Sequence, residues 1–207
     1  MAARYGTRLH IAHVSTADEA ELLRGAPEHV TGETCPTYLL FCDADYARLG
    51  ARIKCNPAVK TAADRDALRA AIGDGTLYSI ATDHAPHRLR EKRGGALRAA
   101  SGVPMVQFSL PAMLDLVAEG VLSVERLVEL MCHHPAALFG LNDRGHVRPG
   151  LAADLVLVAP HAPWTLTPNR ILSRCNWSPL EGHTFRSRVL RTWVGGRCVY
   201  ANEFSAR

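Results

Sequence analysis

The sequence predicts an α/β protein in which a parallel sheet, open or closed into a barrel, is followed by a smaller β-rich unit. Short apolar runs alternate with helical segments as far as about residue 142, which is the pattern of a parallel sheet. After that point β-rich runs flank a Gly195-Gly196 pair, which is typical of a hairpin turn. We therefore expect a division into residues 1–142 and residues 143–207.

The N-terminal region contains a predicted strand–helix–strand unit. Residues 9–14 and 29–34 are short β-prone runs that predict strands. Residues 17–24 form a helical segment with acidic residues in its first turn, and Ser15 or Thr16 can cap it. This unit would place two parallel strands in one sheet.

A long predicted loop separates this unit from a second helix and a third strand. The loop begins where Cys35-Pro36 breaks the second strand, and it extends to about residue 60. Residues 61–73 have helical periodicity, with Thr61 as the cap. The apolar residues 77–81 then predict a buried strand.

The remaining segments predict a mobile loop, two helices and a closing β unit. Glycines and charges over residues 84–104 are typical of an active-site lid. Helices are expected over residues 106–119 and 124–133. Ser123 would cap the second helix, and Pro135 would end it. Strands of the β unit are expected over residues 154–158, 186–194 and 197–200.

Composition excludes several classes of protein. The sequence has no run of about 18 apolar residues that would predict a membrane span, and residues 1–5 lack the apolar core of a signal peptide. The formal net charge is +4 and the basic residues are scattered, so we expect no nucleic-acid partner. Six cysteines without CxxC spacing are typical of free thiols in a reducing compartment, which predicts a cytoplasmic protein.

The densest cluster of reactive side chains follows the strand predicted over residues 77–81. Asp83, His87 and Lys92 lie within one short segment. Polar groups at the carboxyl end of a buried strand are where α/β barrels hold their chemistry. A lone Asp83 would be interpreted as a helix cap, but the full cluster favours a metal ligand or a general base.

A histidine at the end of the first predicted strand would meet this cluster. His13 and Asp83 follow strands of one parallel sheet, so both are expected at the same edge. Imidazole and carboxylate together suit Zn²⁺ or a similar divalent ion. Asp83 could then take a proton from an acidified water and return it to a leaving nitrogen. His13 alone could instead be a hydrogen-bonded core histidine.

Other polar residues have two interpretations each. His87 could bind a substrate carboxylate or be an exposed loop residue, and Asn56 could bind substrate or form a turn. Glu33 is a charged residue inside an apolar strand, so it could pair with an arginine or belong to the site. Lys92 and Arg88 are predicted to be solvated rather than functional.

At these residues the chain resembles the dihydroorotases of the amidohydrolase superfamily. The stretch from Asp83 to His87, with the lysine that follows it, is similar to that family's signature, and residues 13–16 resemble its strand-six motif. Asn56-Pro57 resembles the segment that contacts substrate, and residues 150–156 resemble the entry to its C-terminal β unit. The likeness extends from about residue 9 to residue 200.

This resemblance implies a fold, a reaction and a role for each residue. The fold would be the C-terminal part of a (β/α)8 TIM-type barrel, strands six to eight, followed by a small β unit of a composite sandwich domain. His13 and Asp83 would be metal ligands for zinc, in a centre that is binuclear in the complete family site, and Asp83 would also be the general base. Asn56 and His87 would bind the small-molecule substrate. The reaction would be reversible closure of N-carbamoyl-aspartate to dihydroorotate, in pyrimidine biosynthesis.

Two departures from that pattern leave the substrate and the completeness of the site open. Residues 32–39 look more like hydantoinases and dihydropyrimidinases, which open related cyclic amides. The family's His-x-His pair and bridging lysine would precede residue 13, but residues 1–12 contain no lysine and no His-x-His. A catalytic zinc usually takes three protein ligands, and this pattern supplies two.

The ligand count predicts that the chain alone binds zinc weakly or not at all and is inactive. We expect it to need an upstream barrel half or an oligomer partner. A third interpretation is a non-catalytic module of this fold that assists another enzyme. The joint presence of Asp83, His87 and Asn56 argues against that interpretation, because a scaffold needs none of them.

Overall fold

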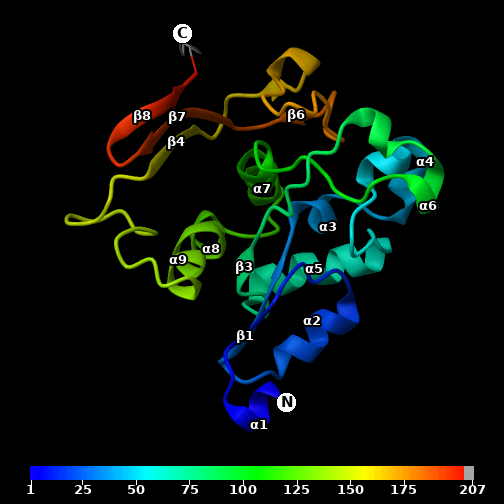
Figure 1. The fold of residues 1–207 in the computed structure, drawn as a ribbon. Coiled ribbons are helices and arrows are strands. Elements are labelled where there is room, and N and C mark those ends of the chain that lie inside the picture. Colours follow the sequence, from blue (N-terminus) through cyan, green and yellow to red (C-terminus); the bar gives the residue numbers. More distant parts are fainter. Residues whose placement is uncertain (203–207) are drawn as a thin grey trace.

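The computed structural model describes residues 1–202, and a three-stranded parallel sheet lies at its centre (Figure 1). The strands are β1 (Leu9–Ile11), β2 (Val30–Thr34) and β3 (Ser79–Ile80), in the order β1-β2-β3. Leu9 pairs with Val30, and Thr34 pairs with Ile80. The predicted α/β class with parallel strands is therefore confirmed, although β1 and β3 are shorter than expected.

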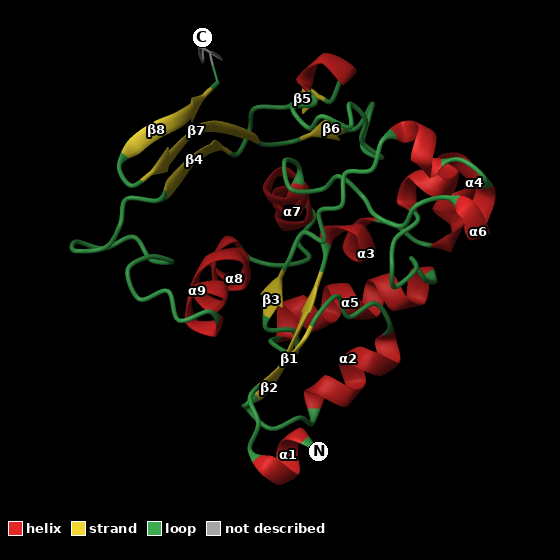
Figure 2. Ribbon diagram, in the orientation of Figure 1, coloured by secondary structure: helices red, strands yellow, loops and turns green. Residues whose placement is uncertain are grey.

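Two capped helices pack against each other beside this sheet (Figure 2), namely α2 (Ala17–Arg24) and α5 (Ala62–Asp74). The hydroxyls of Thr16 and Thr61 accept the backbone N–H of the third helical residue at 3.1 and 3.2 Å. Gly32 of β2 allows α2 to approach closely, because a Cβ there would lie 2.4 Å from the Leu23 side chain. Both predicted helices and their caps are confirmed.

The two segments predicted as long loops contain short helices, so those predictions were wrong. The first contains α3 (Pro36–Leu40), η1 (Asp43–Asp45), α4 (Tyr46–Leu49) and η2 (Gly50–Ile53). The second contains η3 (Leu89–Lys92) and α6 (Gly95–Arg98). Pro36 occupies the first turn of α3, where its missing N–H is not needed. Helices of one turn are too short to produce a hydrophobic period, so the sequence pattern does not reveal them.

The helix predicted to end before Pro135 continues through it. After α7 (Ser109–Ala118), the chain forms α8 (Val124–Val128), the π-helical turn η4 (Glu129–His133) and α9 (His134–Leu138). Ser123 caps α8 as predicted, accepting the Arg126 N–H at 3.1 Å. Pro135 is tolerated because it lies in the first turn of α9, just after the wider π turn.

Antiparallel strands form the C-terminal part, at the end of the molecule away from α1 (Ala2–Tyr5) (Figure 1). One sheet has the order β4-β7-β8, from β4 (Leu155–Ala159), β7 (Arg188–Val194) and β8 (Arg197–Ala201). Gly195 and Gly196, with φ of 55° and 79°, make the predicted hairpin turn. The small pair β5 (Trp164–Thr165) and β6 (Thr184–Phe185), with the 3-10 helix η5 (Pro168–Arg170) between them, was not predicted, because two-residue strands leave no alternation to detect.

Phe185 joins this C-terminal part to the helical layer. Its side chain is fully buried, and its ring stacks 4.9 Å from Trp164 and 6.1 Å from Phe108, which immediately precedes α7. In residues 1–202, no helix combines the length and apolar character needed to cross a membrane.

The parallel sheet has two open edges. Within residues 1–202, β1 and β3 each pair only with β2 among the named strands. The apolar Leu9 and Ile11 of β1 are 43% and 39% exposed, which is unusual for side chains on a strand of a central sheet. The outer side of β1 is therefore not covered by the described chain.

Candidate active site at the strand ends

His13 and Asp83 follow the carboxyl ends of β1 and β3, so they lie at the same edge of the sheet. Both have left-handed backbone conformations, with φ of 42° and 44°. Such a conformation costs about 1 kcal/mol or more in a residue other than glycine. Strained non-glycine residues concentrate at functional sites, where the surrounding structure holds them. The two residues that the sequence had paired share this conformation with Asn176, whose φ is 58°.

The two side chains interact electrostatically. Burial raises the pKa of Asp83 above its ordinary value, the imidazole of His13 opposes this rise, and the Glu33 carboxylate adds to it. Within the described residues neither His13 nor Asp83 has a hydrogen-bond partner for its side chain. The imidazole nitrogens of His13 and the carboxylate oxygens of Asp83 are therefore available to coordinate a metal at the same sheet edge. A histidine held in a protein core would instead have its ring nitrogens hydrogen-bonded.

Glu33 pairs with a histidine rather than with an arginine. Its Oε2 lies 3.1 Å from Nε2 of His10, and Nδ1 of His10 lies 2.7 Å from the Thr31 hydroxyl. These three residues share one face of β1 and β2, because side chains alternate along a strand. Glu33 is therefore near Asp83 but is held by its neighbours.

Two buried thiols, which no sequence pattern had indicated, border the site. Burial raises the pKa of Cys35, with Asp83 and Glu33 adding to the shift, and burial likewise raises the pKa of Cys55. Both thiols are therefore protonated at neutral pH and are poor metal ligands in that form. All six cysteines are free, as expected, but Cys132 and Cys198 are exposed.

Asn56 and His87 lie on the two segments beside this edge. Asn56 is exposed and follows Cys55. The charge of Asp83 contributes to the raised pKa of the Cys55 thiol. His87 is half-buried, with Nδ1 3.9 Å from the Glu91 carboxylate. Its backbone carbonyl accepts the indole N–H of Trp177 at 2.7 Å.

Lys92 is buried, so the prediction that it is solvated was wrong. Only 5% of the residue is exposed, and its Nζ donates to three backbone carbonyls. Arg88 is exposed, as predicted. Charge alone suggested solvation for both, but a lysine can be buried when all three of its N–H groups are paired.

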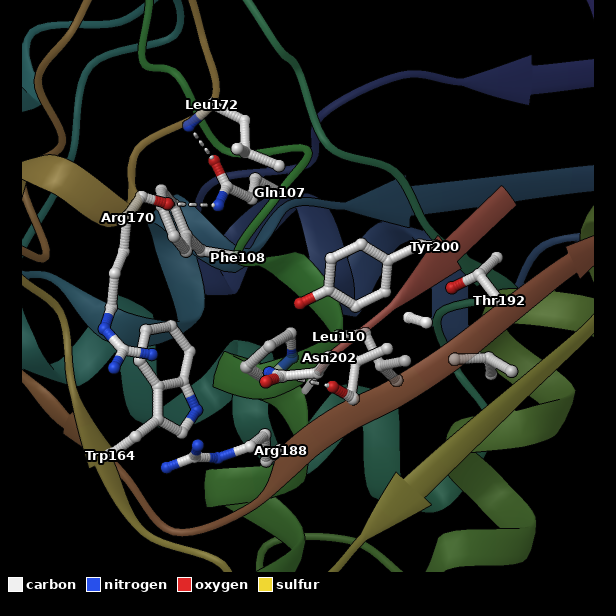
Figure 3. Close-up of a pocket in the computed structure, with 14 residues that line it drawn as sticks. Gln107, Phe108, Leu110, Trp164, Arg170, Leu172, Arg188, Thr192, Tyr200 and Asn202 are labelled. Atoms are coloured by element: carbon white, nitrogen blue, oxygen red, sulfur yellow. Dashed lines mark hydrogen bonds between the residues drawn. The ribbon is translucent and has the colours of Figure 1, made fainter. Parts of the chain in front are cut away.

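A cavity of about 560 Å³ lies elsewhere in the described chain (Figure 3). It separates the β4-β7-β8 sheet from the start of α7, and Trp164, Arg170, Arg188 and Tyr200 line it. It contains none of the predicted site residues.

The described residues provide two donors suited to a divalent metal. His13 offers an imidazole nitrogen and Asp83 a carboxylate, which is a combination that zinc accepts. No group of three His, Cys, Asp or Glu side chains in residues 1–202 is arranged to hold a metal ion. The pair fits part of a catalytic zinc site but does not complete one.

Comparisons with known proteins agree on one family. The profile of the amidohydrolase family matches residues 4–199. The chain is 39% identical to a dihydroorotase of Geobacter metallireducens, over 93% of this chain and 46% of that protein. It is 41% identical to a dihydroorotase of Anaeromyxobacter dehalogenans, over 94% of this chain and 46% of that protein.

The solved structures with a similar fold are hydantoinases and dihydropyrimidinases. The fold is similar to an L-hydantoinase (dihydropyrimidinase) from Arthrobacter aurescens, with a TM-score of 0.92 and 30% identity over 97% of this chain and 46% of that one. A dihydropyrimidinase from Brevibacillus agri gives a TM-score of 0.90 at 25% identity, over 98% of this chain and 46% of that one. The chain thus spans about half the length of the relatives that it matches.

Proposed function

This chain belongs to the amidohydrolase family, and from that premise we propose that it supplies part of the active site of a dihydroorotase-like cyclic amidohydrolase. The single observation that carries the proposal is the pair His13 and Asp83, strained, unpartnered within the described chain and electrostatically linked at one sheet edge. The proposed reaction is the reversible closure of N-carbamoyl-aspartate to dihydroorotate.

In this proposal Asp83 moves the proton. Its carboxylate takes a proton from the attacking water and delivers it to the amide nitrogen that leaves when the ring opens. His13 and Asp83 would also hold the divalent metal through an imidazole nitrogen and a carboxylate oxygen. The metal, when bound, would acidify water and polarise the amide carbonyl.

Asn56 and His87 would bind the substrate. Asn56 is exposed beside the site and offers both a donor and an acceptor, which suits the edge of a cyclic amide. His87 presents a half-exposed imidazole that can interact with a substrate carboxylate.

We further propose that β1, β2 and β3 correspond to barrel strands six to eight, with the β-rich unit beginning near residue 143. The remaining metal ligands would come from an upstream barrel half or a partner chain. The two-donor site and the open outer side of β1 support this requirement. The free thiols are consistent with a reducing cytoplasm.

A second candidate substrate class is the hydantoins and dihydropyrimidines. The likeness to the Arthrobacter aurescens hydantoinase favours it. The chemistry is the same, because both classes are cyclic amides whose C–N bond is opened. Only the groups that contact the ring would differ.

Complementation tests the proposal. The 207-residue chain would be purified alone and together with the portion of the Geobacter metallireducens relative that it does not match. Zinc content and closure of N-carbamoyl-aspartate would be measured for each, with Asp83→Asn as the matched inactive control. We expect zinc and closure only in the wild-type assembly.

Other outcomes would change the proposal in defined ways. Tight zinc and closure by the lone chain would overturn the need for a partner but support the reaction. Turnover of hydantoins without closure of carbamoyl-aspartate would select the second candidate. A stable, metal-free and inactive complex would overturn the enzymatic proposal in favour of scaffolding.

A further inference from the structure

Lys92 is a buried cation that forms no salt bridge with a carboxylate of residues 1–202. Its Nζ donates to the carbonyls of Lys54, Ala100 and Gly102 at 2.9, 2.7 and 2.7 Å. An ammonium group has three N–H donors, so every one of them is used. A buried side chain with all of its donors used in this way is an organising element rather than a surface charge.

The three carbonyls belong to two separate segments. Lys54 lies two residues before Asn56, whereas Ala100 and Gly102 lie at the end of the segment that follows Asp83. The Gly102 N–H also donates to the Lys54 carbonyl at 2.9 Å. Lys92 thus joins the segment that carries Asn56 to the segment that carries His87.

His87 is fixed by the same cluster. A Cβ at Gly102 would lie 2.9 Å from Cδ2 of His87, so the glycine allows the imidazole to pack directly on the backbone. The Trp177 indole donates to the His87 carbonyl at 2.7 Å, and Nζ of Lys92 lies 5.9 Å from the centre of the Trp177 ring. One cation therefore contacts the groups that hold His87 on two sides.

We propose that Lys92 is a positioning residue whose buried ammonium holds Asn56 and His87 in the relative arrangement that substrate binding requires. The inference rests on the proposed function, in which these two side chains bind the substrate. Lys92 itself would contact neither substrate nor metal.

The surroundings of the ammonium agree with this role. Burial lowers the pKa of Lys92 to about 8, the nearby Cys55 opposes this shift, and the Lys54 ammonium adds to it. The Lys54 ammonium donates to the Ala99 carbonyl, and Glu91 faces His87 at 3.9 Å. Asp83 and Lys60 act electrostatically on Cys55 in turn.

Hydrogen exchange in the lone chain tests positioning without any catalysis. Exchange of the Gly102 amide and the Trp177 indole N–H would be followed by NMR in the wild type, Lys92→Met and Lys92→Arg. Arg90→Met, a change at an exposed cation on the same short helix, is the matched control. We expect Lys92→Met to speed exchange at both sites about tenfold or more, with α5 amides unchanged.

The outcome that would overturn the proposal is equal acceleration at Gly102 and in α5, or none at Gly102. If Lys92→Met does not fold, the wild type is titrated from pH 7 to 10 instead. The side-chain signals of Asn56 and His87 should then shift together with Lys92, and signals that stay constant while Lys92 titrates would refute positioning.

A kinetic arm separates this inference from the proposed function. In the complemented assembly, Lys92→Met should raise KM about tenfold and change kcat much less, because the groups lost from position bind substrate. Lys92→Arg should restore part of KM. An inactive wild-type assembly would refute the reaction, whereas the exchange result would still decide whether Lys92 positions the two segments.

Discussion

Two polar clusters at the same end of the parallel sheet differ in how far their hydrogen bonds are satisfied. Around Lys92, all three N–H groups of the ammonium have carbonyl partners. At the strand ends, the His13 and Asp83 side chains have none within residues 1–202, and their backbones are strained. Saturated groups hold a structure together, whereas unsatisfied ones remain available for a ligand.

The buried charges of the two clusters, on Asp83 and Lys92, also differ. Both Asp83 and Lys92 have pKa values moved by burial toward the neutral form. The cost of burying the Lys92 ammonium is offset by three backbone carbonyls of the same chain, which accept its hydrogen bonds. Asp83 lacks such partners among the described residues, which is the state expected of a group that acts on a bound molecule.

The largest expected effect tests the unsatisfied cluster. Asp83→Asn should lower the closure rate of the complemented assembly by about 10³-fold, because the proton carrier is removed. Asparagine tolerates the left-handed backbone, so circular dichroism should be unchanged. A rate within tenfold of the wild type would remove Asp83 from the chemistry.

His13→Asn should reduce the zinc affinity of the assembly by about a hundredfold or more, because one direct ligand is lost. Competition with a chelator would measure this affinity. His10→Asn, one position before the end of β1, is the matched control and should lower stability through the loss of the Glu33 contact without lowering zinc affinity. Equal losses in both variants would contradict the assignment of His13.

Changes in the hydrogen-bonded cluster around Lys92 should alter the stability of the chain. Lys92→Met should lower the free energy of unfolding by about 2–3 kcal/mol, because three buried carbonyls lose their donor. Urea denaturation of the lone chain measures this change. Arg90→Met should stay within about 0.5 kcal/mol of the wild type. A comparable loss in both variants would show that the buried hydrogen bonds of Lys92 do not stabilise the fold specifically.

The pH dependence has a definite sign. The folded pKa of Lys92, about 8, lies below its ordinary value of 10.5, so between these values the unfolded chain binds more protons. The free energy of unfolding of the wild type, relative to Lys92→Met, should therefore rise by about 1–2 kcal/mol between pH 8 and pH 9.5. A difference that falls over this range would mean that the charged form is favoured by folding.

The smallest effect concerns the turn after His13. The Glu19 carboxylate accepts the backbone N–H groups of Ser15 and Thr16 at 2.8 and 3.0 Å. Glu19→Ala should lower the free energy of unfolding by about 1 kcal/mol. Glu21→Ala, at an exposed position of the same helix, should leave thermal unfolding nearly unchanged, and equal effects would show that the cap is not involved.

The sequence predicted the parallel strands, the capped helices and the hairpin because each has a local signal. Thr16, Thr61 and the Gly195-Gly196 turn act through neighbours a few residues away. The convergence of His13 and Asp83 on one edge followed from strand direction. These features depend on short-range chemistry or on topology.

The features that were missed depend on contacts far apart in sequence. Lys92 is buried by carbonyls up to 38 residues away, and Glu33 is held by a histidine 23 residues away. The pattern around Pro135 failed for another reason, because a π turn shifts the helix register without a sequence marker. Charge and hydrophobic periodicity are local properties of the sequence, whereas burial depends on segments that fold around the residue.

The polar face shared by His10, Thr31 and Glu33 affects how the parallel sheet meets water. Because side chains alternate along β1, Leu9 and Ile11 point to the opposite face. The sheet therefore has a polar face and an apolar face. Water can hydrate the polar face at little cost. Association between copies of the chain would then be confined to the apolar face and the unpaired edge of β1.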